Sequence, residues 1–359
     1  MSDFIIENGT LIKYAGKSKR VEIPKDVAVI GSEAFRFCRN LQTVVIPESV
    51  TEIGDSAFSD CENLQNVAIP ESTQKIGGCA FWGCEGLQNI TISNNVTEIG
   101  YGAFFHCKSL KSISVPAKVT KIEEGTFNWC ENLEYAVIPE GVVKIDKEAF
   151  HWCQNLQAVI IPESVTIVEN RAFDGCESLR KIVIPQKIAK IGEYAFYGCP
   201  NISYIYAGEN ITSMINNKNM QKTCATVVTH SENGIGFVAY CSKANSDNFT
   251  DFLENNNWNA YDIELINNGP TYKYKPTVRL LGALGRLNDP VELTDECKEL
   301  YVELLVKNAK KLIPIAEEID CPEIVEMMIK HEIINDGNRK AINKLLKASA
   351  NEKIAAFAE

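Results

Sequence analysis

The chain is 359 residues long, which suits two or three ordinary domains or one repeat array with a cap. Its composition, 45% hydrophobic and 23% charged, is that of a globular protein and argues against disorder. The formal net charge is −11 and no basic stripe is visible, so we expect no nucleic-acid partner.

The first residues form no signal peptide and no membrane span. The segment Met1–Gly9 lacks a cationic region followed by a long apolar one, and nowhere do 18 apolar residues run together. We therefore expect no membrane insertion and a cytoplasmic location, with a cell-surface or secreted location as the alternative if a signal peptide was removed. Two strand-like runs around Asn8-Gly9 predict an N-terminal hairpin cap at residues 1–22.

A 23-residue period dominates the next part of the chain. A phenylalanine recurs in eight copies, and a cysteine follows each one three positions later. The pairs are Phe35/Cys38, Phe58/Cys61, Phe81/Cys84, Phe104/Cys107, Phe127/Cys130, Phe150/Cys153, Phe173/Cys176 and Phe196/Cys199. Such a period without insertions marks a solenoid in which each repeat buries one rung of a shared core. We place this solenoid, of about eight repeats, at residues 23–207.

One repeat, Leu41–Cys61, shows the pattern Leu-x-x-Val-x-Ile-Pro-x-x-Val-x-x-Ile-Gly-x-x-Ala-Phe-x-x-Cys. Its alternating start predicts a short strand, which the proline ends. The glycine, Gly54 in this copy, is expected to adopt a turn conformation closed to other residues. The spacing Ala-Phe-x-x-Cys then favours a turn, a 3₁₀ segment or a helix. The predicted fold class is an α/β solenoid.

This motif resembles the bacterial leucine-rich repeat of the BspA type, also called the Treponema pallidum type. The resemblance runs from about Ile23 to Ala207, slightly over half the chain. It implies a leucine-rich repeat fold. It also implies a protein that works by interaction, since several members are surface-exposed adhesins, but it names no binding residue because those vary.

After the repeats the period is lost. Residues 208–274 are expected to form an irregular α+β cap or connector, with strands at Ala225–Thr229 and Gly236–Tyr240 and a helix near Asp247–Leu253. Residues 275–359 predict an all-α, helical-repeat C-terminal domain. Thr294 is the predicted N-cap of one helix. The apolar stripe of that helix is Cys297, Leu300, Tyr301, Leu304 and Leu305.

Two segments of this helical region resemble each other. Ile315–Ile324 and Leu345–Ile354, 30 residues apart, each have the pattern of a helix–turn–helix unit and are similar to degenerate ankyrin-like helical pairs. The β-turn motif of true ankyrin repeats is absent.

Catalytic and metal-binding patterns are scarce. The four histidines are dispersed, and none of the common nucleophile, zinc or phosphate-loop motifs occurs. His106 beside Cys107 and His151 near Cys153 suggest a Cys–His nucleophile, but both cysteines belong to the repeat ladder. We therefore expect no enzyme, metal site or cofactor. An enzyme with its site in residues 208–359 is the less favoured alternative.

The cysteines fit a structural role. Eight of the 13 occupy one repeat position, where a thiol is a small apolar filler. Rungs about 5 Å apart would permit disulfides, so spacing alone does not decide. We predict reduced, buried thiols, as is usual in a reducing compartment.

The solvent-facing strand positions carry the binding prediction. In leucine-rich repeats the strands line the concave side, and here the outward residues change from small and polar to apolar and aromatic along the array. The candidate partner-binding residues are Tyr135, Val137, Ala158, Ile160, Lys181, Val183, Tyr204 and Tyr206. The same residues would also occur if the C-terminal domain covered this stretch, or if strand propensity alone selected them. The predicted function is a non-enzymatic protein–protein interaction module.

A second aromatic set lies between each phenylalanine and its cysteine: Trp82, Phe105, Trp129, His151, Trp152 and Tyr197. It predicts either a contact surface for a flat partner or carbohydrate, or rings that pack on neighbouring turns and shield the ladder. We favour packing.

Overall fold

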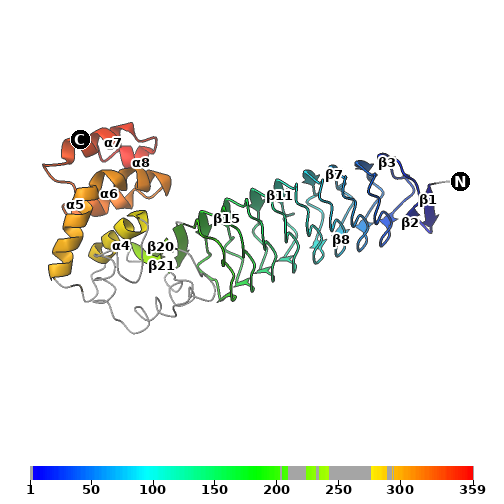
Figure 1. The fold of residues 1–359 in the computed structure, drawn as a ribbon, viewed down its shortest axis with the longest axis horizontal. Helices are drawn as coiled ribbons and strands as arrows, with labels where there is room; N and C mark the ends of the chain where they lie inside the picture. The colour runs from blue at the N-terminus through cyan, green and yellow to red at the C-terminus, as the bar shows by residue number, and fades with distance from the viewer. Residues whose placement is uncertain are drawn as a thin grey trace. The chain divides into compact units, whose positions relative to one another are not determined.

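The fold is that of a computed structural model, which describes residues 3–202, 204–208, 224–231, 234–241, 276–288, 293 and 295–358. Among these, the residues up to Ile202 form one compact unit, and those from Tyr204 onward form another. The first unit runs from blue to green in Figure 1, and the helices of the second run from yellow to red. The helix expected near Asp247–Leu253 and the N-cap expected at Thr294 lie outside the described residues.

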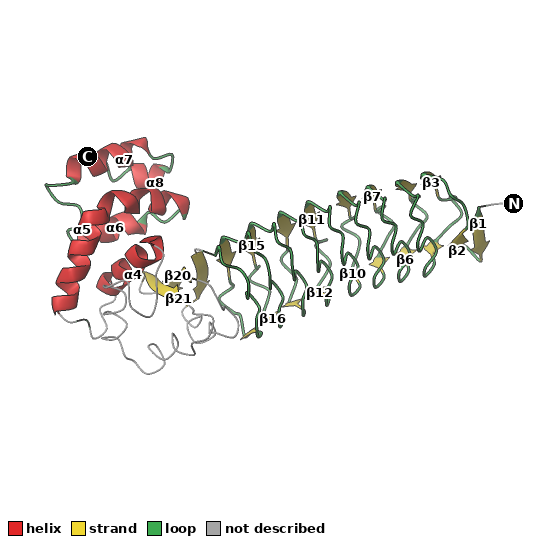
Figure 2. Cartoon of the chain, in the orientation of Figure 1, coloured by secondary structure: helices red, strands yellow, loops and turns green. Residues whose placement is uncertain are grey.

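The first unit is a stack of rungs, numbered here one to eight by their phenylalanines from Phe35 to Phe196. Each rung contributes a three-residue strand and a two-residue strand (Figure 2). The three-residue strands are β3 (Arg20–Glu22), β5 (Thr43–Val45), β7 (Asn66–Ala68), β9 (Asn89–Thr91), β11 (Ser112–Ser114), β13 (Tyr135–Val137), β15 (Ala158–Ile160) and β17 (Lys181–Val183). The two-residue strands are β4 (Val29–Ile30), β6 (Glu52–Ile53), β8 (Lys75–Ile76), β10 (Glu98–Ile99), β12 (Lys121–Ile122), β14 (Lys144–Ile145), β16 (Ile167–Val168) and β18 (Lys190–Ile191).

Like strands of successive rungs pair in parallel, so each rung has one strand in each of two sheets. The second strand was not predicted, because two residues are too few to show a period. Of the three alternatives predicted for the Ala-Phe-x-x-Cys spacing, a turn, a 3₁₀ segment or a helix, the described rungs have the turn, so the array is a β-solenoid and not the α/β solenoid predicted. These turns have N–H to C=O bonds over three residues, such as Cys61 N–H to Phe58 O at 3.2 Å.

Both sheets are interrupted at the same level. The strands β9 and β11 are not hydrogen-bonded to each other, and neither are β10 and β12. The turn side is continuous there, since the Phe104 N–H donates to the Thr126 carbonyl at 2.9 Å. The solenoid is therefore two blocks of four rungs, joined along the turn side and by one bond beside the strands, from the Lys111 N–H to the Gln88 carbonyl at 3.4 Å.

The hairpin predicted around Asn8-Gly9 is confirmed. Strands β1 (Phe4–Glu7) and β2 (Thr10–Tyr14) pair antiparallel, and β2 pairs in parallel with β4 of rung one. The ring of Tyr14 stacks on that of Phe35 with centroids 5.1 Å apart. The hairpin thus extends both a sheet and the aromatic core, and it covers an edge that would otherwise pair with other chains.

The core is a ladder of stacked phenylalanines. All eight are at most 1% exposed, and neighbouring ring centroids lie between 4.9 Å (Phe35–Phe58) and 5.6 Å (Phe104–Phe127). From rung two onward, each ladder thiol donates to the carbonyl of the phenylalanine in the preceding rung, as Cys61 Sγ does to Phe35 O at 3.1 Å. The predicted stacking of phenylalanines and cysteines is confirmed.

The turns owe their shape to residues that the sequence pattern did not single out. In every rung, the positions two before and two after the phenylalanine lie in the left-handed region, for example Glu148 at φ +55° and Trp152 at φ +56° around Phe150. The glycine of the Ile-Gly pair does not, so the role predicted for it is wrong. A Cβ on Gly54 would lie 2.7 Å from the Ser32 nitrogen, so the close approach of the preceding rung requires glycine there.

The second unit combines three strands and five helices among its described residues. Strand β19 (Tyr204–Gly208) pairs in parallel with β20 (Cys224–Ser231), which pairs antiparallel with β21 (Gly234–Cys241). The strands predicted at Ala225–Thr229 and Gly236–Tyr240 are thus confirmed. The helices are α4 (Pro276–Asn288), α5 (Asp295–Glu318), α6 (Glu323–Lys330), α7 (Arg339–Ala348) and α8 (Glu352–Ala355).

These helices match the predicted helix–turn–helix segments. The first segment spans the end of α5 and the start of α6, and the second spans α7 and α8. In the predicted stripe of α5, Cys297, Tyr301 and Leu305 are buried, whereas Leu300 is 40% exposed and lies outside it.

Candidate functional site

The outer surface of the three-residue strands carries four small or apolar side chains side by side. These are Tyr135 and Val137 of β13 and Ala158 and Ile160 of β15, which we call the strand-face patch. Tyr135 is 53% exposed, Val137 60% and Ile160 67%, while the central residue Val159 is 2% exposed. The period of two in a strand explains this alternation.

The pairing of the strands makes the patch continuous. Tyr135 lies opposite Ala158 in the parallel register, and Ala158 lies opposite Lys181 in β17. Paired strands lie about 4.8 Å apart, so side chains at equivalent positions touch. The Tyr135 hydroxyl donates to Gln157 Oε1 of the next rung at 3.3 Å, which ties the ring to that rung.

The same positions in the first block are mostly polar. Asn89 Nδ2 donates to Asn66 Oδ1 at 3.0 Å, so these amides bond to each other along the stack. Val45, at the position equivalent to Val137, is 40% exposed and stands next to Ala68. The change from polar to apolar therefore occurs in the block that begins with rung five.

The remaining predicted residues are less exposed than the patch. Lys181 and Val183 are half-buried at the edge of the patch. Tyr204 and Tyr206 belong to β19 in the second unit, where the Tyr204 hydroxyl donates to Glu318 Oε2 at 3.5 Å and the Tyr206 hydroxyl to the Ile319 carbonyl at 3.3 Å. Tyr204 is only 5% exposed, so the expectation that it faces solvent is wrong. The end of α5 covers it.

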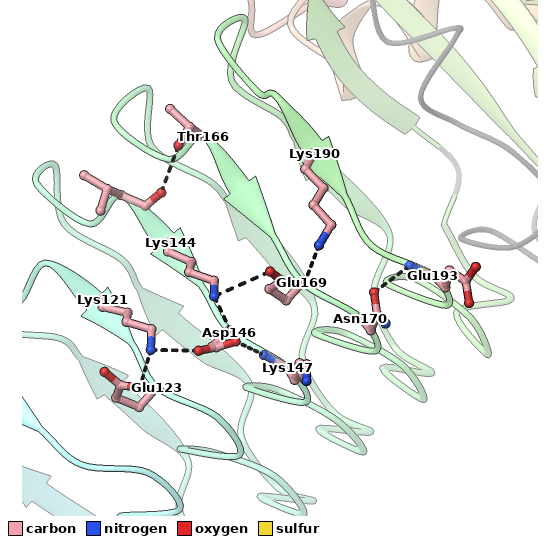
Figure 3. Close-up of polar contacts among 11 residues, drawn as sticks. Lys121, Glu123, Lys144, Asp146, Lys147, Thr166, Glu169, Asn170, Lys190 and Glu193 are labelled. Carbon is pink, nitrogen blue, oxygen red and sulfur yellow. Dashed lines mark hydrogen bonds and ion pairs between the residues drawn. The ribbon is translucent and has the colours of Figure 1, made fainter.

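The surface beside the two-residue strands neutralises its own charge. Lys121 Nζ lies 2.7 Å from Asp146 Oδ2, and Lys144 Nζ lies 3.3 Å from Asp146 Oδ1 (Figure 3). Glu169 accepts from Lys144 and from Lys190 at 3.4 and 2.8 Å. We call this alternating row the lysine–carboxylate ladder. Its acids occupy the repeat position that is glycine in the first block. The sequence shows this substitution, but the repeat pattern of Leu41–Cys61 does not include it.

The aromatic residues between each phenylalanine and its cysteine, which we call the turn-edge aromatics, pack on each other, and this is the alternative that we favoured from the sequence. The rings of Trp82 and Phe105 stack at 3.9 Å, and those of Trp129 and Trp152 at 4.9 Å with 3° between their planes. All four are half-buried. Their faces are turned to neighbouring rungs, so they shield the ladder.

The histidines and cysteines do not form a nucleophilic pair. Cys107 Sγ donates to the Phe81 carbonyl and Cys153 Sγ to the Phe127 carbonyl, each at 3.2 Å. Burial raises the pKa of both thiols well above its ordinary value. His151 instead lies 3.2 Å from Asn128 Oδ1 and 3.5 Å from Asp174 Oδ2. Within the described ranges, no group of three histidine, cysteine or acidic side chains is arranged to hold a metal ion.

Comparison with protein families identifies the repeats. The model for the BspA type leucine rich repeat region matches residues 10–134 and 120–243, which together exceed half of the chain. The chain belongs to this family. The resemblance drawn from the sequence is thereby confirmed.

One solved structure has the same kind of fold. A leucine-rich repeat protein from Bacteroides ovatus is 29% identical, with a TM-score of 0.54, and the match covers 61% of this chain and 56% of that one. The chain thus spans little more than half of that relative. A leucine rich cell surface protein from Faecalibacterium prausnitzii (27% identity, 61% and 73% coverage, TM-score 0.48) is also similar. So is the leucine-rich repeat protein of T. pallidum (27%, 41% and 82%, 0.37).

No functionally curated protein matches the sequence. Among the helices that the structure describes, none combines the length and apolarity needed to cross a bilayer.

Proposed function

We propose that this chain is a non-enzymatic protein–protein interaction module whose contact surface is the strand-face patch. The observation that carries the proposal is the exposure of Tyr135, Val137 and Ile160, each above one half, on neighbouring strands. Large apolar side chains that gather on a surface favour association, because burying them against a partner removes them from water.

Other surfaces of the solenoid offer less to a partner. The lysine–carboxylate ladder has its charges paired, and the turn-edge aromatics have their faces stacked. Ile160 and Val137 instead project from strands whose backbone is fixed by neighbouring rungs, so little conformational entropy is lost on binding. Tyr135 supplies the aromatic anchor that is enriched at binding hot spots.

A cytoplasmic location is part of the proposal. Of the 13 cysteines, 11 have side chains that the structure describes, and these carry thiols. From rung two onward the ladder thiols donate hydrogen bonds that a disulfide would remove. Persistent thiols suit a reducing compartment. The alternative is a surface adhesin, as in several proteins of this repeat type. Fractionation of the native cells separates the two, since an adhesin would be found outside the cell.

The contact is tested by crosslinking. A photoreactive residue placed at position 160 in the full chain should form a covalent product with one protein in native cells. The double variant Val137→Ser with Ile160→Ser should lose this partner in a capture experiment while the unfolding temperature stays within a few degrees, because both side chains are exposed.

The matched control lies in the first block. Val45→Ser makes the same chemical change at the repeat position equivalent to Val137, and the partner should be retained. If the double variant binds as well as the original chain, or if a photoreactive residue at position 45 captures the same partner, the patch is not the contact surface.

A further inference from the structure

The N-terminal end of the solenoid leaves one side of rung one open. The hairpin β1–β2 continues one sheet, and β3 begins the other. On the side away from rung two, the turn segment Phe37–Leu41 faces the loop Ala15–Ser18, and a cavity of about 520 Å³ lies between them. In rung two the equivalent segment is closed by rung one, where Asn63 Nδ2 donates to the Arg39 carbonyl at 2.8 Å.

The lining of this cavity is cationic. Lys13, Lys17 and Arg39 all contribute to its wall, and no acidic side chain does. In the described part of the chain, no carboxylate lies within 4.0 Å of Lys13 or Lys17. Arg39 pairs with Glu62 outside the cavity, through Nε at 2.9 Å.

An aromatic ring completes the wall. Phe37 is 55% exposed, the only ring at its repeat position with more than half of its surface in solvent among the described rungs. The guanidinium of Arg36 sits 4.8 Å from the centroid of this ring, which fixes the ring beside the cavity. Cys38, the first ladder cysteine, is half-buried and also lines it.

We propose that this N-terminal pocket binds a small organic anion. Its phosphate or carboxylate is held by Lys13, Lys17 and Arg39, and its ring lies against Phe37. Charge-assisted hydrogen bonds from ammonium and guanidinium groups are the strong polar contacts for such groups. The volume suits a small molecule. The pocket shares no residue with the strand-face patch, so this site stands whether or not the proposed function holds.

Three small molecules test the charged part and the aromatic part of the pocket separately. Phenyl phosphate carries charge and ring, benzoate carries a carboxylate and the same ring, and inorganic phosphate carries charge alone. We expect saturable binding of phenyl phosphate to the full chain by calorimetry, with amide shifts confined to Ala15–Ser18 and Phe37–Leu41 in nitrogen-15 spectra. Phe37→Ala should weaken phenyl phosphate several-fold and leave inorganic phosphate unchanged.

The charged wall is tested by Lys13→Gln with Arg39→Gln, which should weaken phenyl phosphate about tenfold or more. If that variant fails to fold, Lys13→Gln with Lys17→Gln decides, because both side chains are exposed. The matched control is Lys25→Gln with Lys187→Gln, which removes two exposed cations outside the pocket and should change nothing. Absence of saturation at millimolar phenyl phosphate, or an equal loss in this control, overturns the proposal in favour of unspecific attraction.

Discussion

The rings of Phe104 and Phe127 lie 5.6 Å apart, the widest step of the phenylalanine ladder. Both sheets are interrupted at this step, where Glu123 follows Gly100 at the same repeat position. A Cβ at position 100 would lie 2.5 Å from the Gly78 nitrogen, so glycine permits a closer stack than an acid does. This is the single step in the array at which an acid follows a glycine.

The interruption predicts local opening. The Val143 N–H donates to the Thr120 carbonyl and the Asp146 N–H to the Ile122 carbonyl, each at 2.9 Å. The equivalent N–H groups of Thr120 and Glu123 have no such backbone bond in the described rungs. We expect these two amides to exchange roughly tenfold faster or more than those of Val143 and Asp146, measured by hydrogen exchange. Equal protection would show that the two blocks open together.

The core predicts a large cost for truncating a ladder ring. Phe127 is fully buried between two other rings, so Phe127→Ala should lower the free energy of unfolding by about 3–5 kcal/mol. Phe127→Leu keeps most of the volume and should cost clearly less. Tryptophan fluorescence during urea unfolding reports the first unit through Trp82, Trp129 and Trp152. Similar losses for both variants would contradict a cavity as the cause.

Thiol reactivity should follow burial. Burial raises the pKa of the ladder thiols from Cys61 to Cys176, so at pH 8 they are neutral and unreactive in the folded chain. Burial also raises the pKa of Cys38 and of Cys79, but both are only half-buried. Iodoacetamide should therefore label Cys38 and Cys79 first, as mass spectrometry of the peptides would show. In urea without reductant nearly all 13 cysteines should react, and four or more bridged pairs would contradict the reduced state and the cytoplasmic location.

The lysine–carboxylate ladder predicts a pH dependence. Burial acts to raise the pKa of Asp146, but hydrogen bonds from Lys121, from the Lys147 N–H and from Lys144 outweigh it and hold the pKa below its ordinary value. A lowered pKa contributes stability above the pKa of the unfolded chain, near 3.9 for aspartate, and this stability is lost as the pH falls through the folded value. Asp146→Asn should therefore cost about 1–2 kcal/mol at pH 7 and less below pH 4.

Denaturation at the two pH values measures this difference. The control is Glu98→Gln, since Glu98 is exposed and lies 3.9 Å from Lys75, so that its loss should be small at either pH. A cost for Asp146→Asn that stays constant with pH would assign the effect to packing.

Tyr204 should behave as a core residue of the second unit. Burial and the nearby Glu318 raise its pKa, so the phenol stays neutral. Tyr204→Ala should destabilise the second unit by about 3 kcal/mol, whereas Tyr204→Phe removes only one long hydrogen bond and should cost about 1 kcal/mol or less. Circular dichroism at 222 nm follows the helices of this unit. Full stability of Tyr204→Ala would show that the ring belongs to the surface after all.

The sequence reveals the parts of the fold that repeat. The ladder of Phe35 to Phe196, the three-residue strands and the hairpin at Asn8-Gly9 each follow from a strong local pattern. The two-residue strands do not, since Lys144–Ile145 is too short to show a period. The left-handed residues are also hidden, because the position occupied by Trp152 is taken by glycine in some rungs and by other residues in the rest.

The candidate site was predictable only where a local pattern determines exposure. Alternation places Val137 and Ile160 outward, and both are exposed. Alternation also places Tyr204 outward. That side chain is nevertheless buried, because α5, more than 100 residues away in the sequence, packs on it. A pattern within one rung carries no information about such a contact. The pocket at Lys13 and Arg39 also depends on how a loop meets a turn, which no repeat position encodes.

The order of the rungs along the chain has a consequence for biosynthesis. The antiparallel hairpin leaves the ribosome before the rungs and already carries the ring of Tyr14, onto which Phe35 stacks. Each further 23 residues supply strands and a turn that bond to the rung just completed. Each rung can therefore fold onto the preceding one while translation continues, because it needs no contact with residues that have not yet been made.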